Sequence, residues 1–446
     1  MVNEGKDNLE RSLGPLMLWG LGVGYVISGM YFGWNLGLPE GGTLGLGIAT
    51  LFIALMYVSF TFSYTELACA IPKAGGAFSY SDRALGKNWG FVGGMAQLVE
   101  FVFAPPAIAF AIGAYFHEFF PQFDVMTIAV SSFIIFTFIN IIGVKVAASF
   151  ELFITIFAVI ELLIFSGVAL PHFEFSNLTQ NALPNGISGI FAAIPFAIWF
   201  FLAIEGVANV AEETINPQRN VAIGFGSAMI TLVVLCILTF FSAVGVGGWE
   251  SIVYAEPGLP PSDNPIPLAL AQIVGKDHFL YHLLITVGLF GLVASFHGII
   301  LVAGRATFEF GRVGYFPKVL GKAHQKLKTP YLALIANMLI GIMALLTGRT
   351  GEIITIACFG ALTLYIISMI SLFKLRKSEP NLKRPYLAPF YPAFPLIALI
   401  IATVAIISMT IYNIELALIY AGIMAASFLW FKIFVDHKSP KLAVIK

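Results

Sequence analysis

Charged residues and cysteines are scarce in this chain of 446 residues. Asp, Glu, Lys and Arg together make up 11% of it, and it has three cysteines. A soluble globular protein of this size carries more than twice that share of charge, so this class is excluded. Cys69, Cys236 and Cys358 lie in or beside apolar stretches and lack the paired spacing of a disulfide framework or a zinc site.

Apolar residues dominate what is present. They account for 59% of the chain, which contains 42 Phe and has a mean hydropathy of +0.90. Apolar stretches of about 20 residues recur along the whole length, which predicts one all-α integral membrane domain. The polar N-terminus, MVNEGKDNLERSLGP, lacks the order of a cleaved signal peptide, so we expect the first apolar segment to stay in the mature protein.

Twelve apolar segments follow one another, and we interpret each as a membrane-spanning helix. They cover approximately residues 16–38, 44–70, 89–116, 125–142, 150–170, 187–210, 221–247, 279–303, 331–347, 353–373, 394–412 and 416–434. The loop after segment 7 contains five prolines within residues 249–267, which predicts a stiff, extended external connection. This loop is either a lid or a plain connector.

Basic residues fall on one side of this arrangement. Of the 24 lysines and arginines, all except Lys276 and Arg349 lie on the side of the N-terminus. The positive-inside rule therefore predicts that both termini are cytoplasmic. Equal numbers of acidic and basic residues, 24 of each, leave the net charge uninformative about partners, and we expect the lipid bilayer but no nucleic acid.

Several ionisable side chains lie deep in the predicted spans, and they are Glu100, Glu161, Glu205 and His297. No lysine or arginine does so in this interpretation. Ionised groups in hydrocarbon cost several kcal/mol unless they are paired or wet, so they mark functional sites. The acidic interior favours a cationic ligand or protons. The alternative is that some of these groups are protonated packing residues.

Four stretches together resemble the amino acid–polyamine–organocation superfamily of secondary transporters. They are YTELACAIPKAGGAFSY (64–80), EGVANVAEETINPQRNV (205–221), GRATFEFGRVGYFPKVLGKAHQKLKTP (304–330) and LRKSEPNLKRPY (375–386). The resemblance implies the LeuT-like fold, a five-plus-five inverted repeat in which segments 1 and 6 are broken near the midplane. Repeat one would cover about 14–171 and repeat two about 187–374, with extra helices at about 392–435.

The stretch YVISGMYFGWNLGLPEGG (25–42) is most similar to bacterial ethanolamine permeases within this superfamily. Amino acid carriers usually have a triplet of small residues at the break of segment 1, whose amide N–H groups hold the substrate carboxylate. The corresponding residues here, Ile27 to Tyr31, depart from that pattern. The resemblance thus implies a small amine, most specifically ethanolamine, carried across the bacterial cytoplasmic membrane. The alternative is an amino acid permease or an amino acid/amine exchanger.

The substrate site is expected where the two broken segments meet. Its predicted residues are Glu205, Gly206, Tyr25, Ser28, Gly29, Tyr31, Glu100, Trp199, Phe200 and Ala203. Glu205 and freed backbone carbonyls would hold the ammonium group, and aromatic faces would add cation–π attraction of about 0.5–2 kcal/mol. For each aromatic residue, simple packing is the alternative role.

Coupling and gating residues can also be named. Sodium-linked relatives use hydroxyls of segment 8, where Ser295 stands, and some proton-linked relatives carry a lysine at the position of Ala158. Glu161 and His297 are candidate proton carriers. Proton or sodium coupling, exchange and uniport all remain open. Gate or structural roles are expected for Glu212, Glu213, Arg219, Arg305 and Arg312. Because the seven histidines are scattered, we expect no metal site, no cofactor and no enzymatic activity.

Overall fold

The computed structural model describes residues 11–73, 75–142 and 144–435. Its first half contains the helices α1 Pro15–Val26, α2 Ser28–Tyr31, η1 Trp34–Gly37, α3 Leu38–Ala70, α4 Ala77–Leu85, α5 Lys87–His117, α6 Val125–Ile142, α7 Val144–Ala169, η2 Leu170–His172 and α8 Phe175–Thr179. The second half contains α9 Gly186–Ala192, α10 Ile194–Trp199, η3 Ile204–Glu213, α11 Pro217–Gly247, α12 Glu250–Val253, α13 Pro265–Val274, α14 Phe279–Arg312, α15 Tyr331–Leu345, α16 Thr350–Ser378, α17 Ala393–Tyr412, α18 Ile414–Trp430 and η4 Phe431–Val435.

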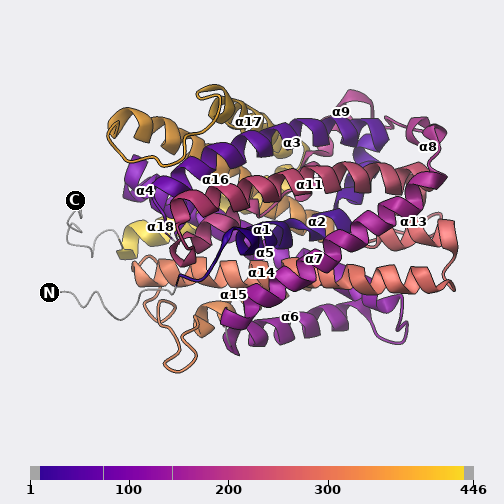
Figure 1. The fold of residues 1–446 in the computed structure, drawn as a ribbon, viewed down its shortest axis with the longest axis horizontal. Helices are drawn as coiled ribbons and strands as arrows, with labels where there is room; N and C mark the ends of the chain where they lie inside the picture. Colours follow the sequence, from indigo (N-terminus) through magenta and orange to yellow (C-terminus); the bar gives the residue numbers. More distant parts are fainter. Residues whose placement is uncertain (1–10, 74, 143, 436–446) are drawn as a thin grey trace.

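The long helices lie side by side along the longest axis of the molecule (Figure 1). In the described residues, ten helical stretches are long and apolar enough to cross a membrane, and they correspond to ten of the twelve predicted segments. The other two, segments 1 and 9, correspond to the shorter apolar helices Pro15–Tyr31 and Tyr331–Leu345. The all-helical membrane architecture is therefore confirmed, whereas the count of twelve spans stays a prediction.

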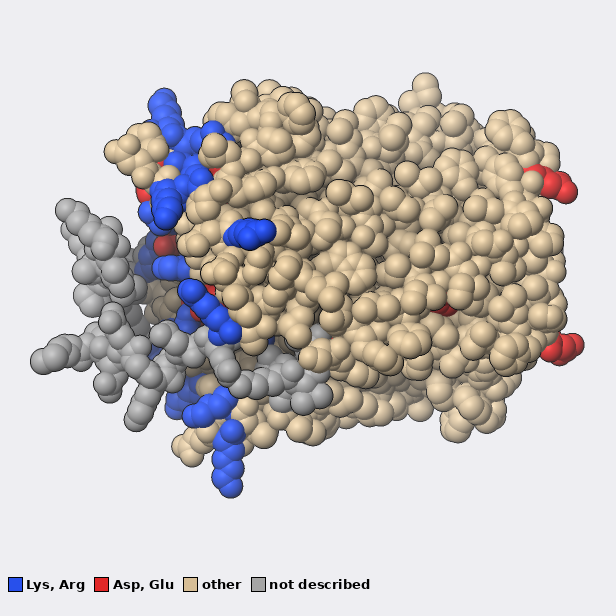
Figure 2. Space-filling view, in the orientation of Figure 1, with Lys and Arg blue, Asp and Glu red and all other residues tan. Residues whose placement is uncertain are grey.

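Charge is distributed unevenly over the surface. Figure 2 shows lysines and arginines gathered at the end of the molecule where α4 lies, next to a broad belt almost free of charged residues. Large apolar side chains face outwards on the long helices, for example Ile230 with 61% exposure. This pattern suits a surface that contacts lipid. Five basic residues of the orientation argument, Lys6, Lys438, Lys441, Lys446 and the side chain of Lys145, lie outside the described part of the chain.

Local sequence explains where several helices begin. Asp124 precedes α6, and its Oδ2 accepts a hydrogen bond from the Thr127 backbone N–H at 3.0 Å, which is an N-terminal cap. Asn216 adopts φ 48°, and Pro217 then opens α11 at its first position. Proline suits this position because its missing N–H would have no helical partner there.

The external loop differs from its prediction. Its prolines led us to expect an extended chain, but the loop contains the helices α12 and α13. Pro265 occupies the first turn of α13, where proline favours a helix rather than ending one. The loop is also tied down at its centre, because Ser262 O accepts from Asn35 Nδ2 at 2.8 Å and Asn264 Nδ2 donates to Glu118 Oε1 at 2.8 Å.

Segments 1 and 6 run antiparallel and in contact. Before α1, the Ile215 N–H donates to Leu13 O at 2.9 Å, so the start of segment 1 lies beside the end of segment 6. Farther along, Gly22 packs against Val207. These contacts bring the middles of the two segments together inside the bundle, where the candidate site lies.

Candidate functional site

Segment 6 is interrupted a few residues before Glu205 and Gly206, the pair that suggested a break in the sequence. The helix α10 ends at Trp199, and the chain resumes at Ile204 as the 3₁₀ helix η3. Between them, Ala203 takes a left-handed conformation with φ 76°, which costs about 1 kcal/mol or more for a residue with a Cβ atom. Its backbone N–H donates to Glu100 Oε1 at 3.1 Å, in a fully buried position. A carboxyl group from segment 3 therefore stabilises the turn.

Segment 1 is interrupted by a side chain from segment 8. In an uninterrupted helix the Ser28 N–H would donate to the Gly24 C=O. Here the Ser295 hydroxyl lies between the two groups, because its Oγ accepts from Ser28 N–H at 2.9 Å and donates to Gly24 O at 2.6 Å. This insertion satisfies both backbone groups where α1 gives way to α2.

The two breaks touch through a glycine. A Cβ atom added to Gly29 would lie 2.4 Å from Trp199 O and 3.1 Å from Phe200 Cα, closer than a side chain permits. Gly206 similarly packs on the Tyr25 ring, which a Cβ would approach to 2.9 Å. Glycine at these positions allows the close approach of the two backbones.

Two buried carboxyl groups meet beside the break in segment 6. Glu100 and Glu205 are both 0% exposed, and the Ala203 N–H that binds Glu100 stands two residues before Glu205. The Tyr365 hydroxyl donates to Glu205 Oε2 at 2.9 Å, and Tyr57 Oη lies 3.1 Å from Tyr365 Oη. The Tyr365 hydroxyl and the Ala203 N–H thus hold the two carboxyl groups in place beside the break.

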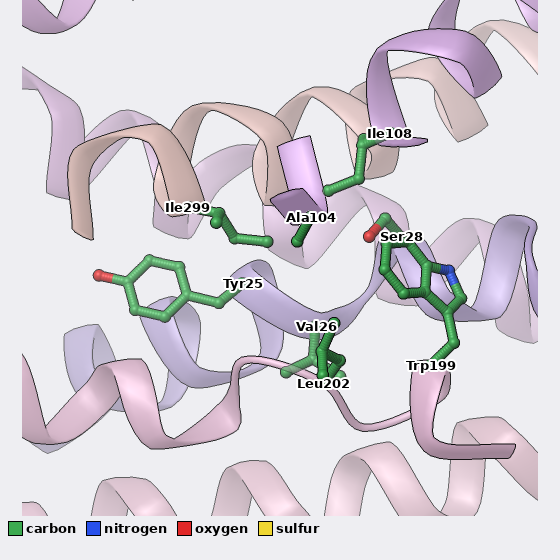
Figure 3. A pocket seen from close by; sticks show the side chains of 8 residues that line it. All are labelled: Tyr25, Val26, Ser28, Ala104, Ile108, Trp199, Leu202 and Ile299. Atoms are coloured by element: carbon green, nitrogen blue, oxygen red, sulfur yellow. The ribbon is translucent and has the colours of Figure 1, made fainter. Parts of the chain in front are cut away.

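A small closed cavity lies beside this acidic pair. It is lined by Tyr25, Val26, Ser28, Ala104, Ile108, Trp199, Leu202 and Ile299. Figure 3 shows Tyr25 and Trp199 at its opposite ends, with Ala104 and Val26 between them. Every lining residue is at most 4% exposed, so the cavity is buried in this conformation, which we call the sealed conformation.

The carboxyl groups do not line the cavity, although they are close to it along the chain. Ala104 stands one helical turn after Glu100 in α5, and Leu202 precedes the Ala203 amide that binds Glu100. Of the predicted substrate residues, Tyr25, Ser28 and Trp199 contact the cavity.

Other predicted aromatic residues occupy packing positions. Phe200 stacks on Trp34 with ring centroids 5.4 Å apart. The Tyr31 hydroxyl donates to Glu161 Oε2 at 2.6 Å and lies 3.0 Å from Ala158 O, which joins segments 1 and 5. Neither ring borders the cavity.

The candidate proton carriers lie in separate surroundings. Glu161 is held by Tyr31, whereas His297 faces Glu151 with Nδ1 and Oε2 3.4 Å apart. The sequence analysis missed Glu151, because it stands at the edge of segment 5 and its partner is 146 residues away. Ser295 bridges the Ser28 N–H and Gly24 O at the break in segment 1.

Two of the residues expected to have gate or structural roles form an ion pair between segments. Glu213 at the end of η3 pairs with Arg305 of α14 at 2.9 Å, and both side chains are largely buried. Arg312 instead pairs with Glu309 of its own helix at 2.8 Å. Arg219 is exposed and Glu212 is partly buried.

Another buried carboxylate connects two of the sequence motifs. Glu66, in the stretch 64–80, accepts from Arg376 Nε at 2.8 Å and from the Ala388 N–H at 2.8 Å, and it also pairs with Arg384 at 3.2 Å. Both arginines belong to the stretch 375–386. These motifs therefore fasten the end of segment 2 to the end of segment 10.

Comparison with known proteins places this geometry in a family. An uncharacterised transporter of Rhizobium meliloti is 27% identical over 95% of this chain and 92% of its own length. A branched-chain amino acid permease of Bacillus subtilis is 25% identical over 92% of this chain and 90% of its own length. A methylthioribose transporter of the same organism is 26% identical over 88% of this chain and 87% of its own length. The family model described as amino acid permease matches residues 13–432, so the chain belongs to the amino acid permease family of multi-pass membrane transporters.

Proposed function

We propose that this protein is a secondary transporter of a small primary amine without a carboxylate group, with ethanolamine as the first candidate. The observation that carries the proposal is the buried pair Glu100–Glu205 beside the broken helix of segment 6. A pair that holds one proton has a net charge of −1, which an ammonium group neutralises. Charge-assisted hydrogen bonds to such a cation are strong in a dry site.

The backbone donors at the breaks argue against a carboxylate on the substrate. The Ser28 N–H is taken by Ser295, and the Ala203 N–H is taken by the protein's own Glu100. A substrate carboxylate would have to displace these partners and would then face two acidic groups. Like charges repel strongly at such a site, whereas an amine keeps the existing hydrogen bonds.

The transport mechanism that we propose is alternating access. We propose twelve spans in a LeuT-like inverted repeat, with both termini in the cytoplasm and the protein in the bacterial inner membrane. Repeats of about residues 14–171 and 187–374 would rock against each other around the site. The antiparallel contact between segments 1 and 6 supports this arrangement, and the sealed cavity is then an occluded state of alternating access.

Uptake into proteoliposomes tests the proposal. We expect the purified protein to take up labelled ethanolamine, with competition from other small primary amines and not from zwitterionic amino acids. Glu205→Gln removes the charge but keeps the shape, and it should lower amine uptake by at least about tenfold, because each lost ionic contact in a dry site is worth more than 1.4 kcal/mol. Glu352→Gln is the matched control, since Glu352 is 45% exposed and pairs with Arg349 within its own helix turn.

The second candidate is an amino acid permease or amino acid/amine exchanger. The family itself and the branched-chain amino acid permease among its relatives favour it. The methylthioribose transporter, at a similar identity, indicates that the substrate class varies within this range of similarity. Uptake of a zwitterionic amino acid in the same assay, with ethanolamine neither carried nor competing, would replace the first proposal by the second.

A further inference from the structure

A buried acid–base pair lies outside the proposed substrate site. Glu151 of α7 and His297 of α14 face each other with Nδ1 and Oε2 3.4 Å apart, and both side chains are 2% exposed. An ion pair between a charged histidine and a carboxylate is usually 2.7–2.9 Å long, so the contact is loose in this conformation.

The glycines of two neighbouring helices make room for this carboxyl group. A Cβ added to Gly24 of α1 would lie 2.5 Å from Glu151 Oε1, and one added to Gly298 of α14 would lie 3.0 Å from it. The same oxygen has no hydrogen-bond donor among the described residues. One turn away on α7, Thr155 donates to Gly20 O at 3.3 Å, so this face of α7 is built against segment 1.

The charged and titratable groups around the pair are few. From α1, the Tyr25 ring packs against Gly298, which also borders Glu151 Oε1, and Arg305 of α14 pairs with Glu213 of η3. From α6, Asn140 Nδ2 donates to the His297 carbonyl at 3.3 Å. Asparagine does not titrate. In the part of the chain that the structure describes, His297 is thus the direct partner of Glu151.

The number of protons on Glu151 and His297 sets the net charge of the pair. With one proton, on either group, the pair is neutral, as imidazolium with carboxylate or as imidazole with carboxylic acid. With none, it leaves a single negative charge buried between three helices, at a cost of several kcal/mol. The sealed conformation therefore favours one bound proton. Water must reach the site before that proton can leave.

We infer that Glu151 and His297 form a proton-binding site that couples transport to the proton gradient, through the packing of Glu151 against segment 1. This inference rests on the proposed transport function but uses residues outside its substrate site. Proton release leaves an anion that is stable only when α1 moves away from α7 and admits water. Loss of the proton thus favours the open state and its return favours the sealed one.

Hydrogen exchange tests the site without any substrate. Once corrected for the intrinsic pH dependence of exchange, amides of residues 15–26 should exchange faster at pH 8 than at pH 6 in the wild type. In Glu151→Gln and His297→Asn this difference should disappear, whereas the exposed control Glu352→Gln should keep it. A wild-type helix α1 without a corrected pH response, or variants that retain the wild-type response, would overturn the inference.

Substrate accumulation in proteoliposomes measures the coupling of transport to the proton gradient. With the membrane potential clamped at zero, an inward gradient of one pH unit sustains about tenfold accumulation of substrate in one-to-one symport. We expect this in the wild type, and no accumulation in Glu151→Gln, which should still exchange labelled for unlabelled substrate. Loss of accumulation in Glu161→Gln instead of Glu151→Gln would contradict the assignment. If no amine or amino acid is carried at all, the proposed function fails, and the exchange experiment still decides the proton site.

Discussion

Replacing Gly29 by alanine tests whether the contact between the two broken segments matters for transport. The new methyl group would lie 2.4 Å from Trp199 O and 3.1 Å from Phe200 Cα. Both are backbone atoms, which cannot rotate away as the end of a side chain can. Overpacking of this kind costs about 1–3 kcal/mol. The cost falls on the sealed conformation, in which the two breaks touch.

A penalty of that size lowers the population of the sealed state by about 5–150-fold. We therefore expect Gly29→Ala to slow uptake into proteoliposomes by about one order of magnitude or more. Gly167→Ala is the control, because Gly167 lies in α7 with no neighbouring atom within 4 Å of an added Cβ. That variant should transport normally and gain slightly in stability. Normal transport by Gly29→Ala would refute the idea that the breaks must approach this closely.

Three further predictions concern other contacts. Ser295→Ala leaves two buried backbone groups of α1 without their bridge, so the midpoint of thermal unfolding should fall by an amount equivalent to about 1–3 kcal/mol and uptake should decrease. Glu66→Gln removes the buried charge that two arginines share, so the free energy of unfolding should fall by about 3–5 kcal/mol, measured by thermal melting followed by fluorescence. The control Glu352→Gln should leave the melting temperature unchanged. Burial raises the pKa of Asp263 in the external loop to about 6, against the opposing effect of the Thr350 hydrogen bond. The closed loop therefore binds the Asp263 proton more tightly than an open loop does. This proton stabilises the closed loop at pH 5, and the stabilisation is lost as the pH rises through 6. Hydrogen exchange of residues 259–264 should be slower at pH 5 than at pH 7, after intrinsic correction, and Asp263→Asn should abolish the difference.

The helices could be predicted because the bilayer constrains sequence strongly, whereas the two breaks were implied by the family resemblance. The predicted segment 125–142 has the bounds of α6, and the pairing of Glu205 with Gly206 stands out in an apolar span. The four motifs were also sufficient for the family, which the match over residues 13–432 confirms.

Contacts between remote segments could not be predicted in the same way. Tyr365 holds Glu205 from 160 residues away, and nothing distinguishes it from other tyrosines in a chain that is 14% aromatic. Glu151 and Glu66 likewise acquire their roles from partners that only the fold brings near. Ser295 was noted for its hydroxyl, but its insertion into the hydrogen bonding of segment 1 depends on the packing of α14 against α1.

The most direct test of the account compares ethanolamine with glycine as ligands of the purified protein. The two molecules share an amino group and differ in that glycine carries a carboxylate in place of the hydroxymethyl group. At a concentration of 100 times its dissociation constant, a ligand stabilises the folded protein by about 2.7 kcal/mol. We expect ethanolamine to raise the melting temperature of the wild type but not of Glu205→Gln, and glycine to raise neither. Equal stabilisation by glycine, or full stabilisation of Glu205→Gln by ethanolamine, would contradict an ammonium site built on the Glu100–Glu205 pair.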